Sequence, residues 1–178
     1  MAVFVLLALS SAANTVDKAS RLLDAIFPKM TTATHAVQAV GYTERLTLGR
    51  DPDEHAAAAE SAPLTADALT YGEFPLDFFE VLVRRALTHA GRDAAGTTLV
   101  DYGSGCGRLV YAAAVLFPEL ERVVGIEVVE SLHQLARRVA PLAAAHADYA
   151  GGSPVSFVHG DASSMLEALM ATERMCVF

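Results

Sequence analysis

A glycine-rich turn that begins with an acidic residue is the strongest candidate for chemistry in this chain. Glycines let a backbone turn tightly and approach a ligand closely. The first turn of a helix after such a turn offers unpaired N–H groups and a partial positive charge, which favour an anionic group. The pattern therefore predicts a ligand site where the helix begins, near Arg108. The turn consists of Asp101, Tyr102, Gly103, Ser104, Gly105, Cys106 and Gly107.

The spacing of these glycines distinguishes between two kinds of cofactor. A dinucleotide site requires G-x-G-x-x-G, in which the third glycine follows the second by three residues. Gly107 instead follows Gly105 by two residues, and Arg108 occupies the position that would need glycine. Asp101 would repel a pyrophosphate, but it can accept hydrogen bonds from a cationic amine or from loop amides. The turn therefore favours an amino-acid-like group, with both carboxylate and ammonium, over a dinucleotide.

Two further acidic residues stand where later strands are expected to end. Glu127 lies 20 residues beyond Gly107, the distance at which an acidic side chain binds both hydroxyls of a ribose. Asp161 follows a third strand and could accept from an exocyclic amine such as that of adenine. The alternatives are a solvated charge at a strand end for Glu127 and a helix N-cap for Asp161. Amino acid, ribose and adenine together describe S-adenosylmethionine.

The elements that would hold these residues alternate between strands and helices. Such alternation is typical of an α/β fold with a parallel sheet covered on both faces, which binds ligands at the carboxyl ends of its strands. We therefore expect a Rossmann-like parallel sheet that stops after about its fourth strand. The strands are expected at Thr98–Val100, Val123–Ile126, Val155–Val158 and Met175–Phe178. The helices are expected from Leu76 to before Gly91, from Val110 to Pro118, and over Val128–Val139.

The first part of the chain has a different character. Residues 1–63 are expected to form a helical segment and linker, and residues 64–178 a second unit that carries the sheet. Ala2 to Leu9 is apolar but too short to span a bilayer, which needs roughly 20 apolar residues. A buried helix is the favoured reading, although residues 1–13 also resemble a cleaved signal without its positive charge. An amphipathic helix is expected from a cap at Thr15 to Pro28.

Composition excludes several classes of function. The 13 basic and 21 acidic residues give a net charge of −8, so no basic surface is expected for direct binding to nucleic acid. Two cysteines cannot form a disulfide framework, which favours a reducing, intracellular location, either nucleus or cytoplasm. The histidines show no metal-binding spacing, so no metal site is expected, and they are interpreted as surface or capping residues. These histidines are His35, His55, His89, His133, His146 and His159.

The motifs resemble those of the class I S-adenosylmethionine-dependent methyltransferases. Within that class, three features together look like the disruptor-of-telomeric-silencing family of histone lysine methyltransferases. They are Tyr71-Gly72-Glu73, the Gly103-Ser104-Gly105 form of the loop, and Gly125-Ile126-Glu127 on the second strand. The resemblance covers roughly Leu69 to Phe178. The motifs that carry the class resemblance are Asp101-x-Gly103-x-Gly105-x-Gly107, Gly125-Ile126-Glu127 and Gly160-Asp161.

The resemblance implies a binding mode for S-adenosylmethionine. Residues 101–108 would wrap its amino-acid portion, Glu127 would hold the ribose, and Asp161 with Ala162 would face the adenine. A loop over the methionine end would be formed by Tyr71, Gly72, Glu73 and Phe74.

The resemblance also implies an activity, which is transfer of a methyl group to a protein lysine. A histone is the expected partner, and a non-histone acceptor is the alternative. The catalytic residues on the acceptor side are expected beyond Phe178, in a segment that is rich in asparagine in this family. A cofactor-binding but inactive fragment, or an interaction module, is the second hypothesis.

Overall fold

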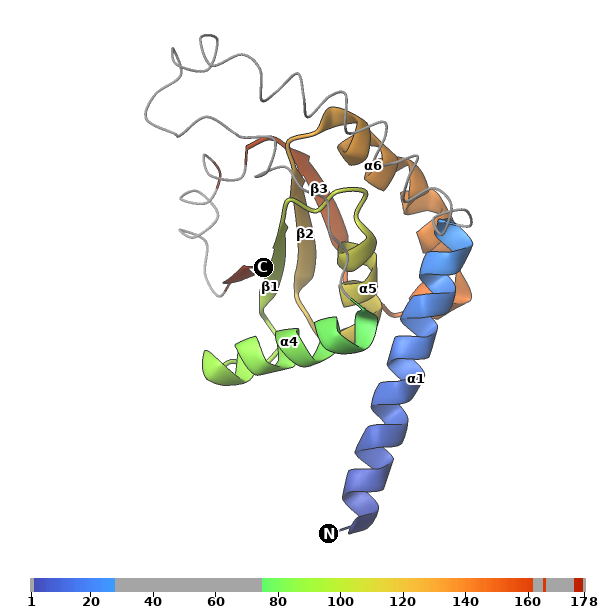
Figure 1. The fold of residues 1–178 in the computed structure, drawn as a ribbon, viewed down its shortest axis with the longest axis vertical. Coiled ribbons are helices and arrows are strands. Elements are labelled where there is room, and N and C mark those ends of the chain that lie inside the picture. Colours follow the sequence, from blue (N-terminus) through green and yellow to red (C-terminus); the bar gives the residue numbers. More distant parts are fainter. Residues whose placement is uncertain (1, 28–74, 162–164, 166–174, 178) are drawn as a thin grey trace.

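Helices and strands alternate along the chain in the computed structural model, which describes residues 2–27, 75–161, 165 and 175–177 (Figure 1). The alternation confirms the predicted α/β class. The elements are α1 (Ala2–Ile26), α4 (Leu76–His89), β1 (Thr98–Tyr102), α5 (Arg108–Leu116), β2 (Arg122–Glu127), α6 (Glu130–Ala145), the 3-10 helix η1 (Ala147–Tyr149), β3 (Val155–His159) and β4 (Met175–Val177).

The strands form a four-stranded parallel sheet in the order β3-β2-β1-β4. Val100 at the middle of β1 lies opposite Val124 on one side and Val177 on the other. The chain moves from β1 to β2 to β3 in one direction and then returns to place β4 beside β1. The winding therefore reverses next to β1, and such a reversal is where open α/β sheets bind ligands, at the carboxyl ends of the strands.

The strands extend further toward their carboxyl ends than the sequence predicted. Parallel pairing continues through Asp101, which lies opposite Gly125, and through Glu127, which lies opposite His159. Both acidic residues are therefore held within paired strands rather than in free loops. The rigid sheet fixes the backbone on which these two carboxylates are mounted.

Both faces of β1 and β2 are buried, as expected for strands of a parallel sheet. Successive side chains of a strand point to opposite faces. Leu99 and Val123 belong to the large apolar cluster that also includes α5. The other face carries a smaller cluster, whose members are Val100, Val124, Ile126, Val158 and Met165.

Helix α5 is buried on all sides, because it lies between the sheet and α1 (Figure 1). Every residue from Val110 to Leu116 is at most 6% exposed. A helix that is apolar around its whole circumference needs such a position, since an amphipathic helix would leave one face to water. The side chains that α1 contributes to the same cluster are Ala19, Leu22, Leu23, Ile26 and Phe27.

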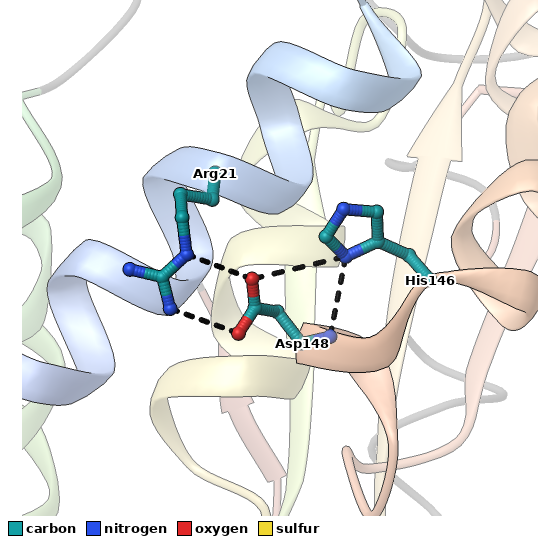
Figure 2. Close-up of polar contacts among 3 residues, drawn as sticks. All are labelled: Arg21, His146 and Asp148. Carbon is teal, nitrogen blue, oxygen red and sulfur yellow. Dashed lines mark hydrogen bonds and ion pairs between the residues drawn. The ribbon is translucent and has the colours of Figure 1, made fainter.

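A polar contact fixes the edge of this helical layer (Figure 2). The Arg21 guanidinium of α1 donates two hydrogen bonds of 2.9 Å, from Nε to Oδ2 and from Nη2 to Oδ1 of Asp148 in η1. These bonds hold the pKa of the Asp148 carboxyl below its usual range. His146 Nδ1 accepts a hydrogen bond of 3.2 Å from the Asp148 backbone N–H, so this histidine caps η1 as predicted.

Helix α1 begins earlier than the sequence predicted. It runs without a break from Ala2 to Ile26, so the predicted cap at Thr15 is wrong, whereas the predicted end before Pro28 is confirmed. No glycine or proline stands between Ala2 and Thr15, and helical hydrogen bonding therefore continues through this stretch. Within the described residues, no helix is both long and apolar enough to cross a membrane.

Candidate cofactor site

The turn between β1 and α5 bends back over the end of β2. The backbone N–H groups of Gly103 and Ser104 both donate to the Ile126 carbonyl, each over 2.9 Å. The Gly107 N–H then donates to the Ser104 carbonyl over 2.8 Å, which closes the turn before α5 begins. The N-terminus of α5 is thereby directed at the carboxyl ends of the strands, as an anion site requires.

Two glycines are required by close approaches in this region. Gly107 has a φ of 84°, in the left-handed region, and a Cβ there would lie 2.6 Å from the Phe157 ring of β3. Gly125 allows a similar approach in β2, because a Cβ there would lie 2.7 Å from Ser104 Oγ. By contrast, a Cβ on Gly103 would meet nothing within 4 Å. The loop therefore depends on Gly107 for both its backbone conformation and its packing against β3.

The Glu127 side chain ties the glycine loop to the end of β2. Its Oε2 accepts a hydrogen bond of 2.6 Å from the Gly105 N–H, and its Oε1 accepts one of 2.8 Å from the Val129 N–H. The residue is only 6% exposed, so these bonds compensate for burying the carboxylate. Glu127 is thus preoriented as an acceptor at this edge.

The Asp101 carboxyl lies half-buried beside this arrangement, and within the described residues it makes no hydrogen bond. Burial raises its pKa to about 7, and the negative charge of Glu127 contributes in the same direction. A cation placed against Asp101 would stabilise its ionised form. This pair of carboxylates therefore suits an ammonium group. Among the described residues, no three side chains of the metal-binding types are grouped as a metal site would need.

Tyr102 and Asp161 come together from β1 and from the segment after β3. Tyr102 is 41% exposed, and partial burial together with the Asp161 carboxylate raises the pKa of its hydroxyl. The Gly160 N–H donates to the Glu127 carbonyl over 3.0 Å, which holds this segment beside the end of β2. The predicted acidic residues of all three strands therefore lie at one edge of the sheet.

Three other predicted residues have positions that limit what their side chains can do. The Cys106 thiol is fully buried, and Ser104 Oγ is buried with no hydrogen-bond partner among the residues that the structure describes. The Arg108 guanidinium lies 6.0 Å from the centre of the Phe27 ring, so it extends toward α1. The predicted residues Tyr71, Gly72, Glu73, Phe74 and Ala162 lie outside the described residues.

Two histidines at this edge were missed as parts of the site by reasoning from the sequence. His159, the last residue of β3, contacts both Glu130 and the Val128 carbonyl. His133 is only 6% exposed, so its interpretation as a surface or capping residue is wrong; it lies on the inner face of α6. Burial, and then the neighbouring His159, lower the pKa of His133. The sequence feature that could have pointed to His159 is its place at the end of a strand, two residues before Asp161.

Neither a scan against models of known protein families nor a search of curated proteins found a match for this chain. The geometry at the carboxyl ends of the strands and the resemblance of the motifs are therefore what support a function.

Proposed function

We propose that the chain binds S-adenosylmethionine at the carboxyl ends of β1, β2 and β3 and serves as the cofactor-binding part of a methyltransferase. The observation that carries the proposal is the hydrogen bond between the Gly105 N–H and the Glu127 carboxylate. It joins the loop suited to an amino acid to the acid suited to a ribose, so one molecule containing both groups can span them.

The two ends of the cofactor have separate partners in this proposal. The half-buried Asp101 receives the ammonium, and the N–H groups at the start of α5 receive the carboxylate. Glu127 accepts from the ribose hydroxyls, and Asp161 accepts from the adenine amine. A dinucleotide fits less well, since its pyrophosphate would lie against two carboxylates. Burial, and then the negative charge of Glu127, already raise the pKa of Asp101.

The proposed acceptor is the amine of a protein lysine, with a histone as the first candidate from the resemblance to the disruptor-of-telomeric-silencing family. S-adenosylmethionine supplies a methyl group on a sulfonium. The amine nitrogen forms the new N–C bond, the C–S bond breaks with its electron pair on sulfur, and the nitrogen then loses a proton. The chain contributes by fixing the donor and excluding water. Its net charge of −8 complements a lysine-rich segment better than a nucleic acid.

Titration calorimetry with S-adenosylmethionine, S-adenosylhomocysteine and NAD tests the binding. Glu127→Gln should weaken the binding of S-adenosylmethionine about 10- to 100-fold, because it removes the charged acceptor that serves both the loop N–H and the ribose hydroxyls. Glu121→Gln is the matched control, since Glu121 is exposed beside the opposite end of β2. Tighter binding of NAD than of S-adenosylmethionine, or equal effects of the two variants, would contradict the proposal.

Transfer of radiolabelled methyl groups to free histones, nucleosomes and a non-histone protein tests the activity. Gly105→Arg is the inactive control, because a large side chain there would fill the loop that receives the amino acid. Labelling by the wild-type chain that is lost in Gly105→Arg supports the proposed methyltransferase activity. Tight cofactor binding without labelling of any acceptor supports the second hypothesis, a cofactor-binding module.

A further inference from the structure

His159 connects the two segments that would hold the nucleoside. Its Nδ1 lies 2.8 Å from Glu130 Oε2, and its Nε2 lies 3.0 Å from the Val128 carbonyl oxygen. Val128 directly follows Glu127, the proposed ribose acceptor, and Asp161 follows His159 by two residues. One side chain therefore fixes the peptide after Glu127 against the end of the strand that leads to the proposed adenine acceptor.

Both atoms that face the His159 ring nitrogens are hydrogen-bond acceptors. One is the carboxylate of Glu130, and the other is the backbone carbonyl of Val128. An imidazole ring carries two nitrogens, so a single side chain can contact both oxygens at once. The His159 ring therefore bridges the start of α6 and the peptide that follows Glu127.

We propose that His159 is a positioning residue for the adenosine half of the cofactor, because it holds the segment from Val128 to Glu130 against the end of β3. This inference rests on the proposed function, and it adds a supporting residue to the same site. When the ring is removed, both contacts are lost, and the segment beside the ribose is held less firmly.

The charged groups around His159 favour this role. Glu130 and His133 face it from α6, and the two histidine rings have centres 5.4 Å apart. His133 is buried, and its pKa is lowered by burial, by His159 and by Arg137. Asp161 lies two residues further along the same segment.

Titration calorimetry of the full chain with adenosine tests the proposal. Adenosine would occupy only the end of the site beside His159, and the wild-type chain should bind it. Methionine, which would occupy only the amino-acid end, is the control ligand, and its affinity should be the same in wild type and in the His159 variants.

Two substitutions at His159 separate positioning from packing. His159→Phe keeps a ring against His133 but removes both ring nitrogens, and it should weaken adenosine binding about 10-fold. His159→Arg keeps nitrogen donors that can reach both oxygens and should retain the affinity. The His159 side chain is 43% exposed, so both replacements can be accommodated. His89→Phe, on the exposed end of α4, is the matched control and should behave as wild type.

The outcomes distinguish this inference from the proposed function. Wild-type chain that binds neither adenosine nor S-adenosylmethionine overturns the proposed function and this inference with it. Binding of both ligands, with His159→Phe matching wild type in its affinity for adenosine, overturns the positioning role alone. Glu130→Gln leaves the ring in place and removes its charged partner. It should weaken adenosine binding less than His159→Phe does. An unchanged affinity would also contradict the positioning role of His159.

Discussion

At the α1–α5 interface most of the contacting side chains are apolar, whereas at the carboxyl ends of β1, β2 and β3 the closest contacts are made by backbone amides and carboxylates. Leu22 and Leu23 of α1 are at most 1% exposed. At the site, Glu127 accepts hydrogen bonds from two backbone N–H groups, and Asp101 remains half-buried. The interface is therefore stabilised mainly by apolar burial, with the Arg108 guanidinium over Phe27 as a polar exception, while the site holds carboxylates that are buried or half-buried.

This difference indicates how each region should respond to change. Apolar burial contributes stability in proportion to the area removed from water and does not depend on pH. Buried carboxylates reduce stability until a cation approaches them. Substitutions at the interface should therefore affect folding, and substitutions at the site should affect ligand binding and pH dependence.

The largest effect is expected from Leu22→Ala in α1. A fully buried leucine lost from a packed cluster lowers the free energy of unfolding by about 3 kcal/mol. Urea unfolding measures this loss, and calorimetry below the transition should find unchanged affinity for S-adenosylmethionine. Asp24→Ala, on the exposed side of the same helix, is the control. A loss below about 1 kcal/mol would mean that α1 is not part of the folded core.

Gly107→Ala is expected to have the next largest effect, because it affects both the backbone and the packing at the site. A left-handed alanine loses about 1–2 kcal/mol, and overlap of its Cβ with the Phe157 ring adds about 1 kcal/mol. Gly103→Ala shares the backbone penalty, with a φ of 79°, but not the overlap. Urea unfolding should therefore rank Gly107→Ala as less stable than Gly103→Ala. Equal stabilities would show that the approach of the loop to β3 is not tight.

Asp101→Asn should remove a pH dependence that the α1–α5 interface lacks. The Asp101 carboxyl has an ordinary pKa of 3.8 when unfolded and about 7 when folded. The folded chain binds more protons between these values, so this residue lowers stability as the pH rises from about 4 to about 7. The variant should exceed wild type by about 1–2 kcal/mol at about pH 8, a figure reduced for the exposed part of the side chain, and should match it at about pH 4.

Urea unfolding at several pH values gives this difference directly. Asp93→Asn, on the exposed segment before β1, serves as the control and should follow the wild-type profile. A constant difference between Asp101→Asn and wild type across the range would contradict the raised pKa.

The smallest effect is expected from Arg21→Met, which keeps the apolar stem and removes the guanidinium. The Arg21 side chain is 56% exposed, and exposed ion pairs contribute little to stability. A thermal melt should shift by less than about 2 °C. A larger shift would mean that the polar contact, and not the apolar side chains, holds α1 in place.

Much of the sheet could be predicted from the sequence, because glycines and prolines separate runs with clear periodicity. Pro75 and Pro118 mark helix boundaries that the structure confirms for α4 and α5. The continuity of α1 could not be predicted, since Ser10, Ser11 and Asn14 lie between the apolar run of residues 2–9 and Thr15, and Thr15 is a typical cap of a separate helix. This stretch continues as a helix because nothing in it breaks backbone hydrogen bonding.

The sequence predicted the glycine turn and the acidic residues of the candidate site, but not the contacts that support them. The positions of Asp101 and Glu127 follow from local patterns, so their meeting at one edge could be expected. The contacts of His159 join residues from α6, β3 and the segment after β2, and no local pattern encodes such a meeting. The contact of Arg108 with Phe27 could not be predicted for the same reason, since it depends on where α1 packs.

The burial of α5 between two layers also has a consequence for local opening. Amide protons exchange with water only when their hydrogen bonds open, and helices surrounded by packed side chains open only with the whole fold. The amides from Tyr111 to Leu116 should therefore be among the slowest to exchange, with a protection close to that of global unfolding. The helix that presents its first turn to the ligand would then be a fixed platform during binding, and exchange changes on adding S-adenosylmethionine should concentrate in the turn before it.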